Sequence, residues 1–296
     1  MSLSAYVLHE GTPIVRALED AAEHGASVDV LLEGRPFQEA ERENEVARAN
    51  AAVASELRSR GATVRLTDVA DEPMHMKAAV VDGRTYLDDR NWTTGERDAL
   101  ITTDGRAVAD AVGNVLHGNV SARVVSSTFA LDKRAAIRLE AQTIAQASGD
   151  RIDVETESFG ATEVSVALRE RARGGTHVRL IVSPEELRGI GADRERRALA
   201  SLAAAGVEIR TSAANEKLCV AGADAWVGSA NATFSPGPII DWGLRSSDSA
   251  LAAGLEARFQ HNWAGGKGLR LERPSLCAAN DDMQGPAPEK KLIQRV

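Results

Sequence analysis

Two segments of this chain, 140 residues apart, carry the same pattern of polar residues. The first holds His75–Lys77 (HMK), which is followed by Asp88–Asn91 (DDRN). The second holds Asn215–Lys217 (NEK), which is followed at the same spacing by Gly228–Asn231 (GSAN). A unit of this length that occurs only twice does not fit a solenoid of many short repeats. It predicts two similar halves that arose by internal duplication.

The similarity continues on the N-terminal side of both segments. Each half has an amphipathic helix that stops at a glycine, Gly25 or Gly175, followed by an apolar run that predicts a buried strand. The two apolar runs are Val28–Leu32 and Val178–Val182. A second helix and a second strand follow in each half. Strands that alternate with helices predict an α/β fold with largely parallel strands.

Each polar segment predicts a β-hairpin of its own. In the first half, Asp82-Gly83 separates two β-prone runs and is a strong turn signal. Gly222-Ala223 takes this place in the second half. Side chains two residues apart on a strand share a face, so we expect His75 and Lys77 to point the same way. By the same rule Glu216 should point away from the face that its neighbours share.

We place the boundary between the halves near residue 125. Residues 1–125 would form an N-terminal lobe and residues 126–272 a C-terminal lobe. Each lobe would be a mixed, largely parallel sheet flanked by helices, and a pseudo-two-fold axis would relate the two lobes. Residues 273–296 carry Pro, Gly, Asn and Lys without periodicity and are expected to form an irregular tail.

Composition narrows the classes of function. The net charge of −8 argues against a general nucleic-acid binder, because such proteins carry an excess of Lys and Arg.

No segment has the roughly 18 apolar residues that span a bilayer, and residues 1–10 lack a signal-peptide pattern, so we expect a cytoplasmic protein. Cys219 and Cys277 lie far apart and are expected to be free thiols, with Cys219 buried in an apolar run.

His75-x-Lys77-x4-Asp82 and Gly228-Ser229-x-Asn231 make the chain similar to the phospholipase D superfamily. Its signature is His-x-Lys-x4-Asp followed by Gly-Ser-x-Asn, usually twice per active site. The resemblance covers about residues 5–265 and implies a metal-independent phosphodiesterase or phosphatidyl transferase that needs no cofactor. The residue types suit this chemistry, because a neutral imidazole can attack phosphorus while ammonium and amide groups hold the phosphate oxygens.

The resemblance also implies a role for individual residues. His75 would be the nucleophile and would form a phosphohistidine. The groups expected to bind the phosphate are Lys77, Lys217, Asn91 and Asn231, with Ser229 assisting. An acidic residue beyond each asparagine would orient the imidazole, and the candidates are Asp98 or Glu96 in the first half and Asp241 in the second. Asp82 would order the hairpin turn rather than touch the substrate.

Asn215 stands where the superfamily has a second catalytic histidine. An amide does not titrate near neutral pH, so Asn215 cannot act as a general acid, a role that typically contributes about 10²- to 10⁴-fold. Three explanations stay open. The protein is a degenerate member with weak or altered activity, the histidine was deliberately replaced, or a different residue serves as the acid.

Asp88 and Asp89 stand where the superfamily has Gly-Ser. Two carboxylates beside a phosphate would repel it unless they turn outward or pair with Arg90. Alternatively, they would favour a substrate with a cationic head group.

Two functions are consistent with these observations. The first is an enzyme that acts through His75 on phospholipids, with nucleic acid as the second choice because the chain is acidic. The second is a phosphate- or phospholipid-binding protein that has lost catalysis through Asn215. In either case we expect a monomer without a transmembrane segment, whose contact with a membrane would be peripheral.

Overall fold

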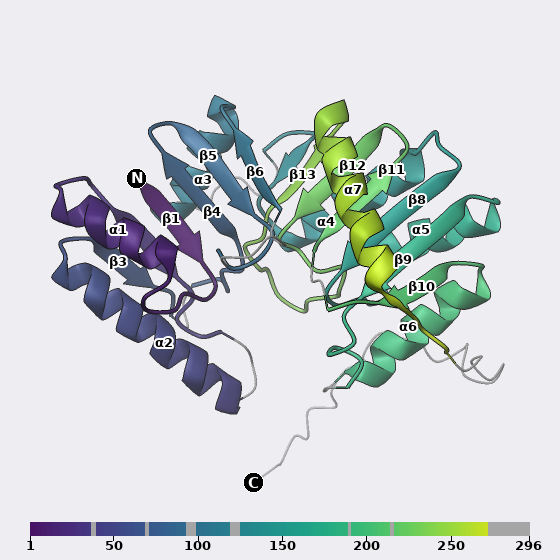
Figure 1. Cartoon of the computed structure of the whole chain (residues 1–296), viewed down its shortest axis with the longest axis horizontal. Coiled ribbons are helices and arrows are strands. Elements are labelled where there is room, and N and C mark those ends of the chain that lie inside the picture. The colour runs from purple at the N-terminus through teal and green to yellow at the C-terminus, as the bar shows by residue number, and fades with distance from the viewer. Residues whose placement is uncertain are drawn as a thin grey trace, which may run out of the picture.

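The computed structural model describes residues 1–36, 40–68, 71–92, 99–118, 125–188, 191–213 and 216–271, without the side chains of residues 40–44. Within these ranges the chain forms two α/β lobes that lie next to each other (Figure 1). Several residues singled out from the sequence lie outside the described ranges, namely Glu96, Asp98, Asn215, Cys277 and the expected tail at 273–296.

The N-terminal lobe is built on a six-stranded sheet in the order β3-β2-β1-β4-β5-β6. Its strands are β1 (Ser2–Ala5), β2 (Asp29–Leu32), β3 (Thr63–Leu66), β4 (Lys77–Val81), β5 (Arg84–Asp88) and β6 (Leu100–Thr103). Its helices are α1 (Pro13–Glu23), α2 (Ala40–Ser59) and α3 (Arg106–Leu116).

The C-terminal lobe repeats this order as β10-β9-β8-β11-β12-β13, with β14 and β7 added at the two edges. Its strands are β7 (Phe129–Ala130), β8 (Arg151–Thr156), β9 (His177–Val182), β10 (Glu208–Thr211), β11 (Leu218–Ala221), β12 (Asp224–Gly228), β13 (Gly243–Ser246) and β14 (Lys267–Gly268). Its helices are α4 (Lys133–Gln146), α5 (Glu163–Arg173), α6 (Ala192–Ala204) and α7 (Ser249–Gly265).

The shared strand order confirms the predicted pair of similar α/β lobes with mixed sheets. The expectation that the strands would be largely parallel is wrong. Parallel pairs join β1 to β2 and β2 to β3, and likewise β8 to β9 and β9 to β10, whereas the other ladders are antiparallel. The reason is the hairpin in each polar segment. Its first strand runs against β1 or β8, and each later strand reverses direction again.

The predicted Asp-Gly turn joins β4 to β5. Asp82 and Gly83 both adopt positive φ, at 50° and 82°, which is the backbone of a two-residue type I′ hairpin turn. Asp82 is exposed there, at the end of β4 opposite to His75. Its location therefore fits a role in the turn.

Apolar packing and backbone pairing join the two lobes. One buried cluster contains Met76 and Leu87 from the first lobe together with Leu218 and Trp242 from the second. Trp242 Nε1 also donates a hydrogen bond to the carbonyl oxygen of Asp88 at 3.1 Å. Within the described ranges, no helix has the length and apolar character required to cross a bilayer.

Candidate active site

His75 lies just before β4, in an extended segment that both lobes hold in place. Its backbone N–H donates to the carbonyl oxygen of Ile240 at 2.8 Å, and the N–H of Ile240 donates to Pro73 at 2.9 Å. On the first-lobe side, the N–H of Met74 donates to Glu33 Oε2 at 2.6 Å. The position of the imidazole is therefore fixed by segments that lie far apart in the sequence.

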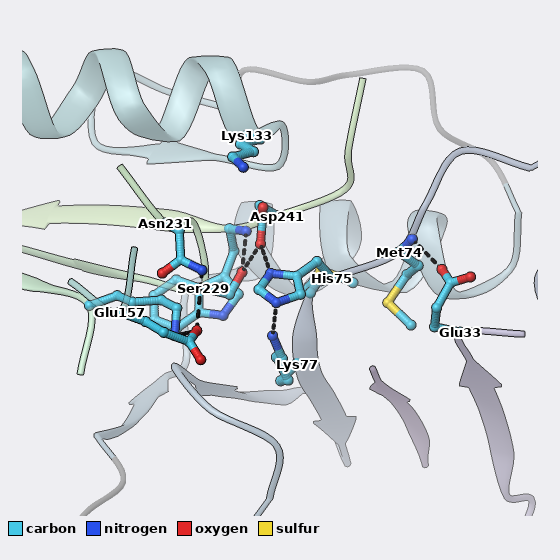
Figure 2. A network of polar contacts seen from close by, with 12 residues as sticks. Glu33, Met74, His75, Lys77, Lys133, Glu157, Ser229, Asn231 and Asp241 are labelled. Atoms are coloured by element: carbon cyan, nitrogen blue, oxygen red, sulfur yellow. Dashed lines mark hydrogen bonds and ion pairs between the residues drawn. The ribbon is translucent and has the colours of Figure 1, made fainter. Parts of the chain in front are cut away.

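Figure 2 shows the imidazole of His75 between Asp241 and Lys77. Nδ1 lies 2.8 Å from Asp241 Oδ1, and Nε2 lies 2.9 Å from Lys77 Nζ. The same Asp241 oxygen accepts a hydrogen bond from Ser229 Oγ at 2.7 Å, and Ser229 Oγ accepts one from the N–H of Trp242. Ser229 thus holds the carboxylate that holds the imidazole.

The charged groups around His75 determine which of its ring nitrogens carries the proton. Burial disfavours the Asp241 carboxylate, but attraction to His75 and the hydrogen bond from it outweigh burial, so the pKa of Asp241 is lowered. An ionised Asp241 accepts a hydrogen bond from Nδ1–H, so the lone pair of the neutral ring lies on Nε2. Burial, followed by repulsion from Lys77, lowers the pKa of His75, so the ring is neutral near pH 7.

The motif lysine of the second lobe acts on the same site. Burial and the charge of Lys217 together lower the pKa of Lys77 to about 7. The charge of Lys217 also contributes to the lowered pKa of His75. Both lysines are almost completely buried. The structure therefore brings His75, Lys77 and Lys217 together around one centre.

Lys217 and Asn231 share a carboxylate that lies outside both sequence motifs. Lys217 Nζ lies 3.3 Å from Glu157 Oε2, and Asn231 Nδ2 donates to the same oxygen at 3.2 Å. The charge of Lys217 lowers the pKa of Glu157 to about 2, so this carboxylate is ionised at neutral pH. Glu157 follows β8 directly, and only the pairing of β8 with β11 reveals its proximity to Lys217.

A third ammonium group, also missed from the sequence, comes from the first residue of α4. Lys133 Nζ donates to Thr233 Oγ1 at 3.0 Å, and Figure 2 shows the side chain above Asp241. Burial lowers the pKa of Lys133, with opposing electrostatic contributions from Asp241 and Lys217. Lys133 lies on α4, which precedes β8 and is outside the segments that were compared between the two halves, so that comparison could not have indicated this lysine.

The two aspartates of the first segment hold the backbone. The carboxylate of Asp88 accepts hydrogen bonds from the N–H groups of Arg90 and Trp92. The carboxyl group of Asp89 accepts the N–H of Ala99 at 2.9 Å and that of Lys217 at 3.4 Å. Both side chains are buried, and burial together with nearby Glu216 raises the pKa of Asp89 well above its usual value. The raised pKa favours an uncharged Asp89 and so reduces its expected repulsion of a bound phosphate, whereas the charge of Asp88 acts on Lys77.

Other predicted residues are located as follows. Asn91 follows β5, and its Oδ1 is buried without a hydrogen-bond partner in the described structure. Glu216 is fully buried next to Arg258, at 3.3 Å, on the side that strand alternation predicted. Cys219 is a buried free thiol, as expected. In the part of the chain that the structure describes, no group of three or more His, Cys, Asp or Glu side chains could hold a metal ion.

Gly228 illustrates why the second segment retains a glycine. A Cβ at this position would come within 2.5 Å of the carbonyl oxygen of Trp242 and 2.8 Å of the ring of Trp226. The absence of a side chain lets Trp242 pack close to β12, and this brings the preceding residue, Asp241, to Ser229.

Comparison with known proteins agrees with this architecture. The chain matches the family described as "Cardiolipin synthase, PLD-like domain" over residues 1–117 and 141–263. The phosphatidylserine synthase of Haemophilus influenzae Rd KW20 superposes with a TM-score of 0.62 at 12% identity, covering 91% of this chain and 82% of that one. The polyphosphate kinase of Porphyromonas gingivalis gives 0.61 at 15% identity, covering 89% of this chain and 42% of the kinase, so this chain spans less than half of the kinase's length.

No curated protein sequence is significantly similar to the chain. At such low identities the two structural likenesses show the fold alone. The family match is broader evidence, because it includes both lobes and both polar segments. The chain therefore belongs to the cardiolipin synthase, phospholipase D-like domain family, within the phospholipase D superfamily that its motifs resemble.

Proposed function

We propose that this protein is a metal-independent phosphodiesterase or phosphatidyl transferase that acts through a phosphohistidine at His75. The observation that carries the proposal is the environment of the imidazole. Asp241 accepts a hydrogen bond from Nδ1–H, so Nε2 of the neutral ring is the nucleophilic nitrogen next to the ammonium group of Lys77. Lys217 and Asn231 from the other lobe complete a set of donors suited to phosphate oxygens.

The first step would join His75 Nε2 to phosphorus and break the bond to the leaving alcohol, which departs with a proton from the solvent or a nearby acid. The imidazole becomes positively charged, and the Asp241 carboxylate stabilises that charge. In the second step, water or another alcohol attacks phosphorus and loses a proton. The phosphorus–nitrogen bond then breaks and neutral His75 is restored.

Proton transfer to the leaving group is the weak part of this site. Asn215 cannot supply a proton, and Glu157, with a pKa of about 2, is already deprotonated at neutral pH. We therefore expect slow turnover of alkyl esters and much faster turnover of esters whose leaving group needs no protonation.

Phospholipid is the substrate class that we favour. The matching family is described by cardiolipin synthase, and one structural neighbour is a phosphatidylserine synthase, although the latter is similar in fold alone. A nuclease is less consistent with the net charge of −8.

A bis(4-nitrophenyl) phosphate assay combined with peptide mass spectrometry tests the chemistry. We expect release of nitrophenol and an aryl phosphate adduct on His75 after rapid acid-free quenching, with both signals absent in His75→Ala. Asn215→His should then raise turnover of a dialkyl phosphate by up to about 10²-fold, since it restores a titrating group.

The second candidate function is a phosphate- or phospholipid-binding protein, and the replacement of the second histidine by Asn215 favours it. It would be supported if the wild type binds a phosphodiester but gives neither turnover nor adduct, and if Asn215→His also gives none.

A further inference from the structure

We propose that Glu157 determines specificity by filling the phosphate subsite of the second lobe, so that the site accepts an oxyanion with one negative charge and disfavours one with two. The singly charged class includes phosphodiesters. The doubly charged class includes phosphomonoesters and free phosphate. The proposal rests on the proposed function for the identity of the substrate.

The contacts of Glu157 are those expected of a bound phosphate oxygen. Oε2 lies 3.3 Å from Lys217 Nζ and accepts the amide of Asn231 at 3.2 Å. The resemblance to the phospholipase D superfamily implies that these two groups bind the phosphate. The side chain is one-third exposed, so an incoming anion can reach and displace it.

The first lobe has an uncharged residue at the equivalent position. Ser4 on β1 pairs with Ala78, and Glu155 on β8 pairs with Leu218, so Tyr6 and Glu157 each lie two residues further along equivalent strands. The ring of Tyr6 contacts His75 edge-on, with centroids 4.9 Å apart, and lies 5.5 Å from Lys77 Nζ. At this position, therefore, the second lobe has a carboxylate next to its motif lysine where the first lobe has a phenol ring.

The ionisable groups of the site give a simple charge balance. Three ammonium groups (Lys77, Lys133 and Lys217) lie with three carboxylates in the described structure, namely Asp241, Glu157 and Asp88, the last of which acts on Lys77. When all are ionised, the positive and negative charges balance, and a diester monoanion that takes the place of the Glu157 carboxylate keeps this balance. A dianion would leave an excess negative charge among buried groups, which is unfavourable. Without Glu157 the site would have one more positive charge and would suit a dianion better.

Sulfate and methyl sulfate test this idea without turnover, because both are tetrahedral and differ by one charge. Their affinities would be measured by calorimetry at about pH 6.5, below the pKa of about 7 of Lys77. Coulomb energy scales with ligand charge, so Glu157→Gln should strengthen sulfate binding more than methyl sulfate binding and raise the ratio of the two affinities about tenfold. Glu157→Ala should raise the ratio in the same direction, and Lys217→Met in the Glu157→Gln background should cancel the gain.

Glu185→Gln is the matched control, because Glu185 is an exposed glutamate that follows the neighbouring strand β9 at the same edge of the sheet. It should leave the affinity ratio unchanged. An unchanged ratio in Glu157→Gln and Glu157→Ala, with folding verified by thermal unfolding, would overturn the proposal. A raised ratio without any adduct on His75 would instead refute the proposed catalytic function alone.

Discussion

The two lobes share one strand order but differ at the residues that meet at the site. The first lobe has His75 and the uncharged Tyr6, whereas the second has Asn215 in the sequence and the ionised Glu157. The second lobe in turn supplies Asp241, which bonds to the imidazole of the first. The difference teaches that, in the proposed mechanism, the two halves divide the work, since one supplies the nucleophile and the other its orienting carboxylate.

The backbone shows the same interdependence. Asp89 of the first lobe accepts the N–H of Lys217, and Trp242 of the second lobe donates to the carbonyl oxygen of Asp88. Neither lobe alone contains a complete site. A substitution in one lobe therefore tests whether the other lobe can compensate for it.

Loss of the nucleophile should have the largest effect. We expect His75→Ala to lower kcat/KM for bis(4-nitrophenyl) phosphate by about 10⁴-fold or more, because no other imidazole of the motif is present to attack phosphorus. His177→Ala is the control, since this exposed histidine pairs with Glu208 on the surface of the second lobe. Retention of more than about a tenth of the activity in His75→Ala would contradict the division of labour.

The second-largest loss of activity should follow removal of the Asp241 charge, which orients His75 in the proposed mechanism. Asp241→Asn should lower kcat by about 10²- to 10⁴-fold, because an amide can hold the wrong tautomer and does not stabilise the imidazolium. Asp193→Asn, at an exposed position on α6, should change nothing. Equal activity of Asp241→Asn and wild type would show that the carboxylate of the second lobe is not needed to orient the imidazole of the first.

The pH dependence of kcat/KM tests the protonation states of His75 and Lys77. His75 must be neutral, so kcat/KM should rise with pH through a value below 6.5. Lys77 must be charged, so kcat/KM should fall by up to about tenfold per pH unit above about pH 7. Lys77→Arg should move the upper limb to higher pH. A rate that stays constant from neutral pH to about pH 9 would mean that Lys77 need not be protonated.

The smallest effect is expected at the packing between the lobes. Trp242→Phe removes the hydrogen bond to Asp88 and leaves a buried carbonyl oxygen unpaired, which should lower the free energy of unfolding by about 1–2 kcal/mol. Urea unfolding would measure this change, and the two lobes should still unfold in one transition. Two separate transitions in the wild type would show that the lobes are independent.

Much of the fold could be predicted from the sequence because duplication shows each element twice. The positive φ values of Asp82 and Gly83 confirm the hairpin turn that the Asp-Gly dipeptide predicted. The predominance of antiparallel pairs was missed, because the alternation of strands and helices says nothing about the direction in which β4 joins β1.

The site was predictable where its residues belong to the motifs or, like Asp241, follow one of them as the family resemblance implies. Lys133 and Glu157 lie outside them and reach the site through the placement of α4 and the pairing of β8 with β11. The direction of the Asp89 carboxyl group depends on Ala99 and Lys217, which are distant in sequence. Such contacts follow from tertiary packing, and no local pattern indicates them.

A crystal structure with bound diethyl phosphate would test most directly whether the two lobes act on one phosphorus atom. We predict that His75 Nε2 will face phosphorus while Lys77 and Lys217 both contact its oxygens, with Glu157 displaced from Lys217. An anion held by one lobe alone, with His75 and Lys217 on different ligands, would contradict this account.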